Sequence, residues 1–171
     1  MVVLRPTRKL QATLPASRDG DATSDTALGD WYVNRILVDR QPLLLLVSSR
    51  SLLPILILGR DVRSLPDRLA DLVAARLRRM GISPRFIAAE ARAMSPVRIA
   101  KTTDRSVLGI IVDFAKGIPF YLEAGGWDET TLLFVERRLA ETPCYAARRS
   151  EEVVFPDKKT PELLAGRWHA G

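Results

Sequence analysis

Apolar residues near the start of the chain and again near residue 100 follow the pattern of short strands. The run Val2–Leu4 predicts a strand that Pro6 ends, and the polar, small-residue segment 15–30 then predicts a loop. In residues 96–101, Val97 and Ile99 alternate with polar or small residues, a period of two that is typical of a half-buried strand. These two strands bracket a more apolar region.

Residues 31–59 are rich in valine, isoleucine, leucine and aromatic side chains. Polar breaks at residues 39–42 and 48–51 predict the turns of an antiparallel meander. The unbroken apolar run Leu43–Val47 indicates a strand that is covered on both faces. Pro54 disfavours a central position for the third strand, or marks its start.

The middle of the chain changes to helical spacing. Apolar residues recur every three or four positions across residues 65–80, where Ser64 and Asp67 form a pattern typical of a capping box. A second helix is predicted over residues 84–94, with Ser83 as its cap and a proline in the first turn. Three arginines near the end of the first helix suit its dipole and predict a solvated face: Arg76, Arg78 and Arg79.

Two further helices follow. The first begins at Asp104, has a wide apolar face and should bend or end near Gly117 and Pro119. The second begins after Asp128 and ends before Pro143.

Together these elements predict one α+β domain over residues 1–145, an antiparallel sheet flanked by about four helices. Residues 146–171 are expected to form a C-terminal tail that packs in part through residues 153–155.

Composition argues against several kinds of site but does not identify a function. Of 171 residues 47% are hydrophobic, as expected for a folded domain. The chain has one cysteine, Cys144, and one histidine, His169, which argues against an internal disulfide, a cysteine-rich zinc site and a histidine-based triad. We therefore expect no cofactor and no metal site built on these residues. Whether the chain is an enzyme stays open.

Charge suggests a class of partner. The net charge is +6 and the isoelectric point about 10.0, which favours a phosphate-bearing partner such as nucleic acid. The arginines are spread along the chain, however, and a GC-rich coding bias would produce the same excess. The chain starts without a secretory pattern, and the interrupted apolar region 42–59 is too short to span a membrane. A soluble, cytoplasmic protein without a membrane partner is expected.

The polar start of residues 100–117 is the nearest approach to a motif. Lys101, Thr102, Thr103, Arg105 and Ser106 surround a predicted helix start, where unpaired N–H groups attract anions. The alternative is a helix capped by Thr103 or Asp104 with solvated cations beside it. The cap leaves the two cations unexplained, because the helix dipole disfavours them there. Lys101, Thr102, Thr103, Arg105 and Ser106 are therefore the candidate anion-binding residues.

Acids and aromatics offer weaker candidates. The acids nearest apolar segments could hold magnesium if two or three converged: Asp30, Asp39, Asp61, Glu90 and Asp113. Trp31 and Tyr32 could stack a base, but their position at a strand start favours the core.

Two blocks of the sequence resemble a known family. Residues 28–34, with the letters LGDWYVN, are followed at residues 101–113 by KTTDRSVLGIIVD. This order is similar to that of a family of small bacterial proteins classified as a domain of unknown function, although Val112 stands where that family usually has asparagine. The resemblance implies a bacterial, stand-alone domain and brings no activity, cofactor or partner.

We expect the two blocks to meet at one edge of the sheet. This would place Asp30, Trp31 and Asn34 beside the anion candidates, with Asp30 paired to Arg105 and Asp113 as the alternative acid. Three function classes remain open: a non-enzymatic module that binds a phosphate-bearing partner, a hydrolase or transferase that uses Asp30, Asp113 and Lys101, and a protein-interaction subunit, for example of a toxin–antitoxin or defence system.

Overall fold

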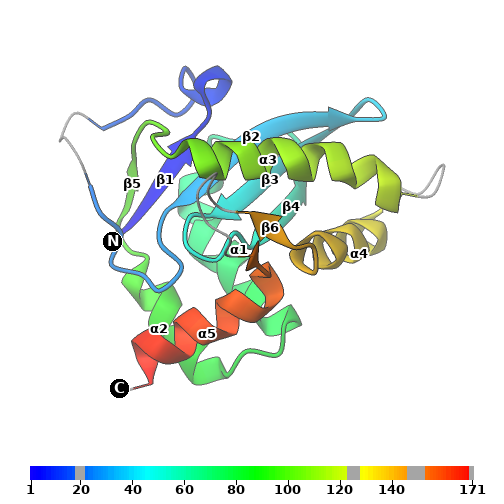
Figure 1. Ribbon diagram of the computed structural model, residues 1–171. Helices are drawn as coiled ribbons and strands as arrows, with labels where there is room; N and C mark the ends of the chain where they lie inside the picture. Colours follow the sequence, from blue (N-terminus) through cyan, green and yellow to red (C-terminus); the bar gives the residue numbers. More distant parts are fainter. Residues whose placement is uncertain (18–21, 123–127, 146–152, 170–171) are drawn as a thin grey trace.

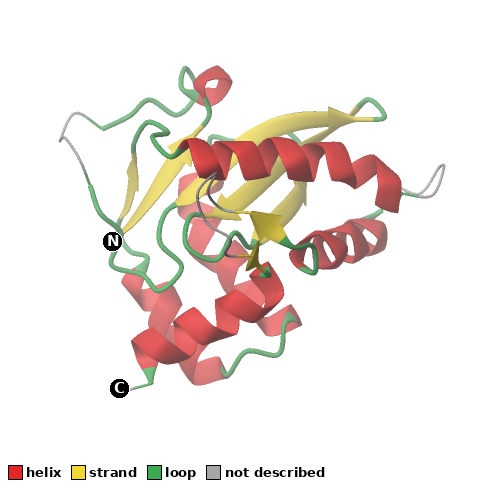
Figure 2. Cartoon of the chain, in the orientation of Figure 1, coloured by secondary structure: helices red, strands yellow, loops and turns green. Residues whose placement is uncertain are grey.

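The computed structural model describes residues 1–17, 22–122, 128–145 and 153–169. Its strands are β1 Val2–Pro6, β2 Trp31–Val38, β3 Gln41–Ser48, β4 Pro54–Leu58, β5 Val97–Ile99, β6 Cys144–Tyr145 and β7 Val153–Val154. Its helices are α1 Leu65–Arg79, α2 Pro84–Ala93, α3 Arg105–Gly117, α4 Glu129–Ala140 and α5 Pro156–Trp168, with short 3₁₀ turns η1 Arg8–Leu10 and η2 Ile118–Tyr121. The fold is α+β (Figures 1 and 2).

The main sheet has five strands in the order β4-β3-β2-β1-β5. The predicted meander is confirmed, since β2, β3 and β4 pair antiparallel. The prediction of a wholly antiparallel sheet is wrong: β1 runs parallel to both β2 and β5. The long loop after β1 returns the chain to the end where β1 began, so β2 starts beside Leu4. Side chains alternate between the two faces of a sheet in parallel and antiparallel strands alike, so the apolar pattern does not distinguish the two kinds of pairing. The unbroken apolar run of β1 was the one sign of a parallel strand.

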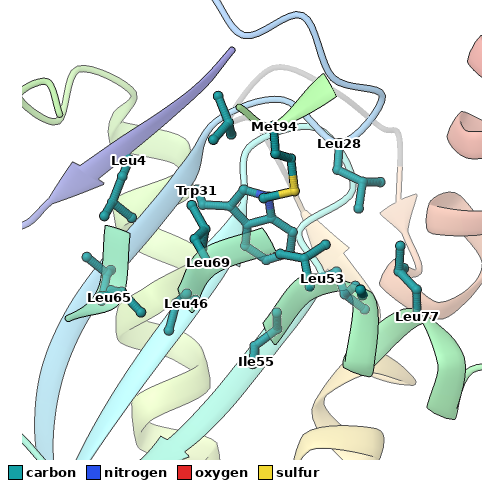
Figure 3. Close-up of a cluster of buried hydrophobic side chains, with 14 of the residues drawn as sticks. Leu4, Leu28, Trp31, Leu46, Leu53, Ile55, Leu65, Leu69, Leu77 and Met94 are labelled. Carbon is teal, nitrogen blue, oxygen red and sulfur yellow. The ribbon is translucent and has the colours of Figure 1, made fainter. Parts of the chain in front are cut away.

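Helices cover both faces of the sheet. One face packs Trp31, Leu46 and Ile55 against α1, α2 and α5, as part of the cluster in Figure 3. The other packs Tyr32 and Leu45 against α3 and α4. Strand β3 is buried from Leu43 to Ser48, as its apolar run predicted. The sheet is therefore the middle of three layers (Figure 1).

Helix starts follow the expected chemistry only where the cap is an aspartate. Asp104 and Asp128 each accept backbone N–H hydrogen bonds from the first turn of α3 and α4. Ser64 does not cap α1, because its hydroxyl donates to Asp61 Oδ2 at 2.6 Å. Ser83 makes no side-chain cap bond either. Helix α3 ends at Gly117, before the proline of η2, as predicted.

The tail contributes a fifth helix, α5, which the sequence did not predict. Leu164 of α5 is buried in the first cluster. Trp168 donates its indole N–H to Glu90 Oε2 at 2.7 Å. The fully buried Glu90 carboxylate also accepts the backbone N–H groups of Ala27 and Leu28, at 2.9 and 3.0 Å. One carboxylate thus joins α2, the loop before β2 and α5.

A buried ion network closes the edge of the sheet at β4. Glu136 of α4 is 1% exposed and accepts the Leu56 N–H of β4 at 2.9 Å through Oε2. Its Oε1 binds Arg76 Nε at 2.9 Å and Arg79 Nη2 at 2.8 Å. Arg76 is therefore buried, and the predicted solvated face is wrong for this residue. Its side chain is the donor that Glu136 needs, because an unpaired carboxylate inside the fold would be strongly destabilising.

We predict that Glu136→Gln lowers the free energy of unfolding by about 3 kcal/mol or more, because it leaves Arg76 buried without its counter-charge. The control is Glu141→Gln, which removes an exposed acid just beyond α4 and should change the value by less than about 0.5 kcal/mol. Urea denaturation followed by circular dichroism measures both. Equal losses in the two variants would show that the network does not stabilise the fold.

Candidate functional site

The candidate residues gather where the chain changes direction across the sheet. From β1 the chain continues to β2 on one side, and it later returns to add β5 on the other side. The segments that follow β1 and β5 lie next to each other, because these strands pair in parallel with Leu4 beside Ile99. In open α/β sheets such a switch point, at the carboxyl ends of parallel strands, is a favoured place for ligands.

Arg5 of β1 organises this place. Its Nε donates to Asp30 Oδ2 at 2.6 Å, and a terminal guanidinium nitrogen donates to the Lys101 carbonyl. Ser24 donates to Asp30 Oδ1 at 2.6 Å, so both carboxylate oxygens are engaged. The two sequence blocks therefore do meet, through Arg5. The predicted Asp30–Arg105 ion pair is wrong, because Arg5 occupies Asp30.

The aromatic pair beside Asp30 divides between the two faces of the sheet. Tyr32 is buried, and its hydroxyl accepts the Asp104 N–H at 3.0 Å, a second link between the blocks. Trp31 is 0% exposed and lies in the cluster of Figure 3, and its indole nitrogen has no hydrogen-bond partner in the described part of the chain. Burial removes both rings from any base-stacking surface and confirms the interpretation of them as core residues.

The start of α3 is closed by its own cap. Asp104 Oδ1 accepts the N–H groups of Ser106 at 2.8 Å and Val107 at 3.4 Å. An anion would therefore compete with a carboxylate for these donors. Thr102 and Ser106 are half-buried and Thr103 is exposed. The simpler interpretation, a self-capped helix, accounts for the aspartate.

The cap does not account for the cations. Lys101 and Arg105 are exposed, and neither makes an ion pair with any residue in the described ranges. Arg8 and Lys9 of η1 are also exposed, just after β1. We call Arg8, Lys9, Lys101 and Arg105 the basic edge. It lies along the adjacent segments that leave β1 and β5 (Figure 1).

The remaining candidates have other surroundings. Asn34 Oδ1 accepts the Thr7 hydroxyl at 2.7 Å, which fixes the chain as it leaves β1. Asp113 lies about 12 Å beyond Arg105 along α3 and borders a cavity of about 130 Å³ with Cys144. Burial and, to a smaller extent, Asp113 raise the pKa of the Cys144 thiol to about 11. The thiol thus stays protonated at neutral pH, which makes it a poor nucleophile.

The acids proposed for magnesium stay apart. Asp30 binds Arg5, Glu90 binds backbone N–H groups, and Asp61 binds Ser64. Of the five acids, Glu90 alone is fully buried. Within the described ranges, no three histidine, cysteine or acidic side chains gather in a way that could hold a metal ion. Nor does any helix there have the length and apolar character that crossing a bilayer requires.

Sequence reasoning missed Arg5, the residue that joins the two blocks. Its signal was a single charged side chain at the end of an otherwise apolar strand. In a strand covered on both faces, a charge of this kind requires a partner, but Asp30 was expected to pair with Arg105 instead.

The chain matches a family model described as a domain of unknown function, DUF6933, over residues 3–159. No curated protein and no solved structure matches the chain. The matched range includes the main sheet apart from Val2, helices α1 to α4 and the whole basic edge. The chain therefore belongs to the DUF6933 family.

Proposed function

We propose that this protein is a non-enzymatic module that binds a phosphate-bearing partner, nucleic acid, at its basic edge. The observation that carries the proposal is the group of four exposed cations at the carboxyl ends of β1 and β5. Asp104 is the acid that stands among them in the sequence, and Asp30 is already bound to Arg5. The described part of this edge therefore has excess positive charge.

Side chains rather than helix N–H groups would hold the phosphates. The Asp104 cap occupies the start of α3, so its N–H groups are not available as an anion cradle. Arg105 offers a planar fork that matches a phosphate, and Lys101 offers a compact charge. Exposed cations bind a single phosphate weakly in water. A polymer gains from several such contacts at once, because each releases counterions.

Arg5 supplies the rigid base that such a surface needs. It is 11% exposed and already saturated by Asp30 and the Lys101 carbonyl, so it positions the Lys101 backbone instead of contacting a ligand. Tyr32 holds the Asp104 backbone in the same way. The cations thus project from a segment whose backbone is fixed at two points, which reduces the entropy lost on binding. The hydrolase alternative has no comparable support, since Asp30 is held by Arg5 and Asp113 lies about 12 Å beyond Arg105 along α3.

We predict that Lys101→Ala/Arg105→Ala weakens binding of a fluorescently labelled oligo-dT by about tenfold or more at low salt. If each cation contacts one phosphate, the slope of log K against log salt falls by about 1.4, that is about 0.7 per contact. Fluorescence anisotropy at several salt concentrations measures both quantities. The matched control is Arg78→Ala/Arg92→Ala, which removes the same charge from exposed positions on α1 and α2. No binding by the wild type, or equal losses in both double variants, would contradict the proposal.

Asp104→Asn should act in the opposite direction. Asparagine also caps helices well, so the fold is retained, but the negative charge that repels a phosphate is removed. We expect binding of the same oligonucleotide to strengthen by about twofold to fivefold, in line with a surface-charge contribution below about 1 kcal/mol. The control is Asp113→Asn, farther along α3, which should leave the affinity unchanged. Weaker or unchanged binding of the Asp104 variant would place the partner elsewhere.

A further inference from the structure

A second feature lies away from the basic edge, between α1, α4 and α5. These helices enclose a cleft of about 670 Å³, within the range of small-molecule sites. Its most informative lining residues are Arg76, Arg79, Phe134, Glu136, Arg137 and Asp157. Nothing in the proposed nucleic-acid binding uses them.

The floor of the cleft holds two arginines that share one carboxylate oxygen. Arg76 and Arg79 both bind Oε1 of Glu136, because Oε2 is taken by the Leu56 N–H. The other acids of the lining, Asp157 and Glu141, come from α5 and from just beyond α4. Arg79 keeps 34% of its side chain exposed at the cleft, so it can still meet an anion. Arg137 stands at the same opening and adds a further cation.

Asp157 requires a hydrogen-bond donor, whereas the arginines can bind an anion. It lies in the first turn of α5 and lines the cleft. Its Oδ1 is buried and has no hydrogen-bond partner among the residues that the structure describes. A buried acceptor without a donor is destabilising by about 1–3 kcal/mol, so this oxygen favours a ligand that carries an N–H group.

The wall between these charges is apolar. Leu133 and Phe134 of α4 are 43% and 44% exposed, and both line the cleft. The Arg137 guanidinium lies 5.8 Å from the centre of the Phe134 ring. Apolar side chains that are exposed beside an arginine provide a surface for a flat aromatic group.

We propose that this cleft binds a small aromatic zwitterion of the α-amino-acid type. Its ring would lie against Leu133 and Phe134, its carboxylate would meet Arg79 and Arg137, and its ammonium group would donate to Asp157 Oδ1. The three requirements come from three separate observations: the cations, the exposed apolar wall and the unpartnered buried oxygen. A ligand with only one charged group would satisfy one side of the cleft and leave the other unsatisfied.

The test uses three probes that differ by one group: L-phenylalanine, 3-phenylpropanoate, which lacks the amine, and 2-phenylethylamine, which lacks the carboxylate. Isothermal titration calorimetry on the full chain should show L-phenylalanine binding about tenfold or more tightly than either analogue. Equal affinities for the three probes, or no binding of L-phenylalanine, would overturn the proposal.

Two variants assign the charged contacts. Asp157→Ala should weaken L-phenylalanine about tenfold and leave 3-phenylpropanoate unchanged. Arg137→Ala should weaken both of these probes and leave 2-phenylethylamine unchanged. The control is Arg78→Ala, an exposed arginine of α1 that does not line the cleft. Thermal melts confirm folding, and binding of oligo-dT should stay at the wild-type value in every variant. L-phenylalanine binding that neither cleft variant alters would overturn the proposal.

Discussion

The structure depends on carboxylates that satisfy groups left unpaired by a two-faced sheet. Helices cover both faces, so backbone N–H groups at strand edges and in connecting loops lose water and need acceptors. Glu136 accepts from the edge of β4, and Glu90 accepts from the loop before β2. Asp30, half-buried, accepts from Arg5 and Ser24. Each acid binds at least one group from a segment distant in sequence, and so fixes tertiary structure as well as local geometry.

This use of acids affects the surface. Glu90 is fully buried, and among the described residues its carboxylate binds N–H groups and no cation. Asp30 and Glu136 are also withdrawn from solvent, but each takes an arginine with it, Arg5 and Arg76. Of these three acids, Glu90 alone leaves the surface without an arginine. A general coding bias could supply the arginines, but it does not determine which acids fold inward.

The sequence predicted most helices and strands because periodicity is a local property. Strand β3 and helix α3 follow directly from apolar spacing. The parallel pairing of β1 depends on where a long polar loop returns the chain, which no local pattern encodes. Helix α5 was missed because Pro161 and several charged residues obscure its apolar face. Arg76 was misplaced for a related reason: its acid partner lies 60 positions away, on α4.

In the candidate site, too, local sequence explains some residues, and contacts between distant segments explain others. Within the two sequence blocks, several residues have a structural explanation. Gly29 has φ of +77°, and a Cβ there would lie 2.5 Å from Ser49 Oγ, so no larger residue fits without a shift. Asp30, Tyr32 and Asn34 each hold a neighbouring segment, and Asp104 caps α3.

Lys101 and Arg105 differ from these residues. Their side chains make no ion pair within the described ranges, although the Lys101 carbonyl accepts a hydrogen bond from Arg5, and the dipole of α3 opposes their charge. The proposed phosphate-bearing partner would give these two side chains a role. Packing, capping and ion pairing explain the other residues of the candidate site, but they do not explain the cations of the basic edge.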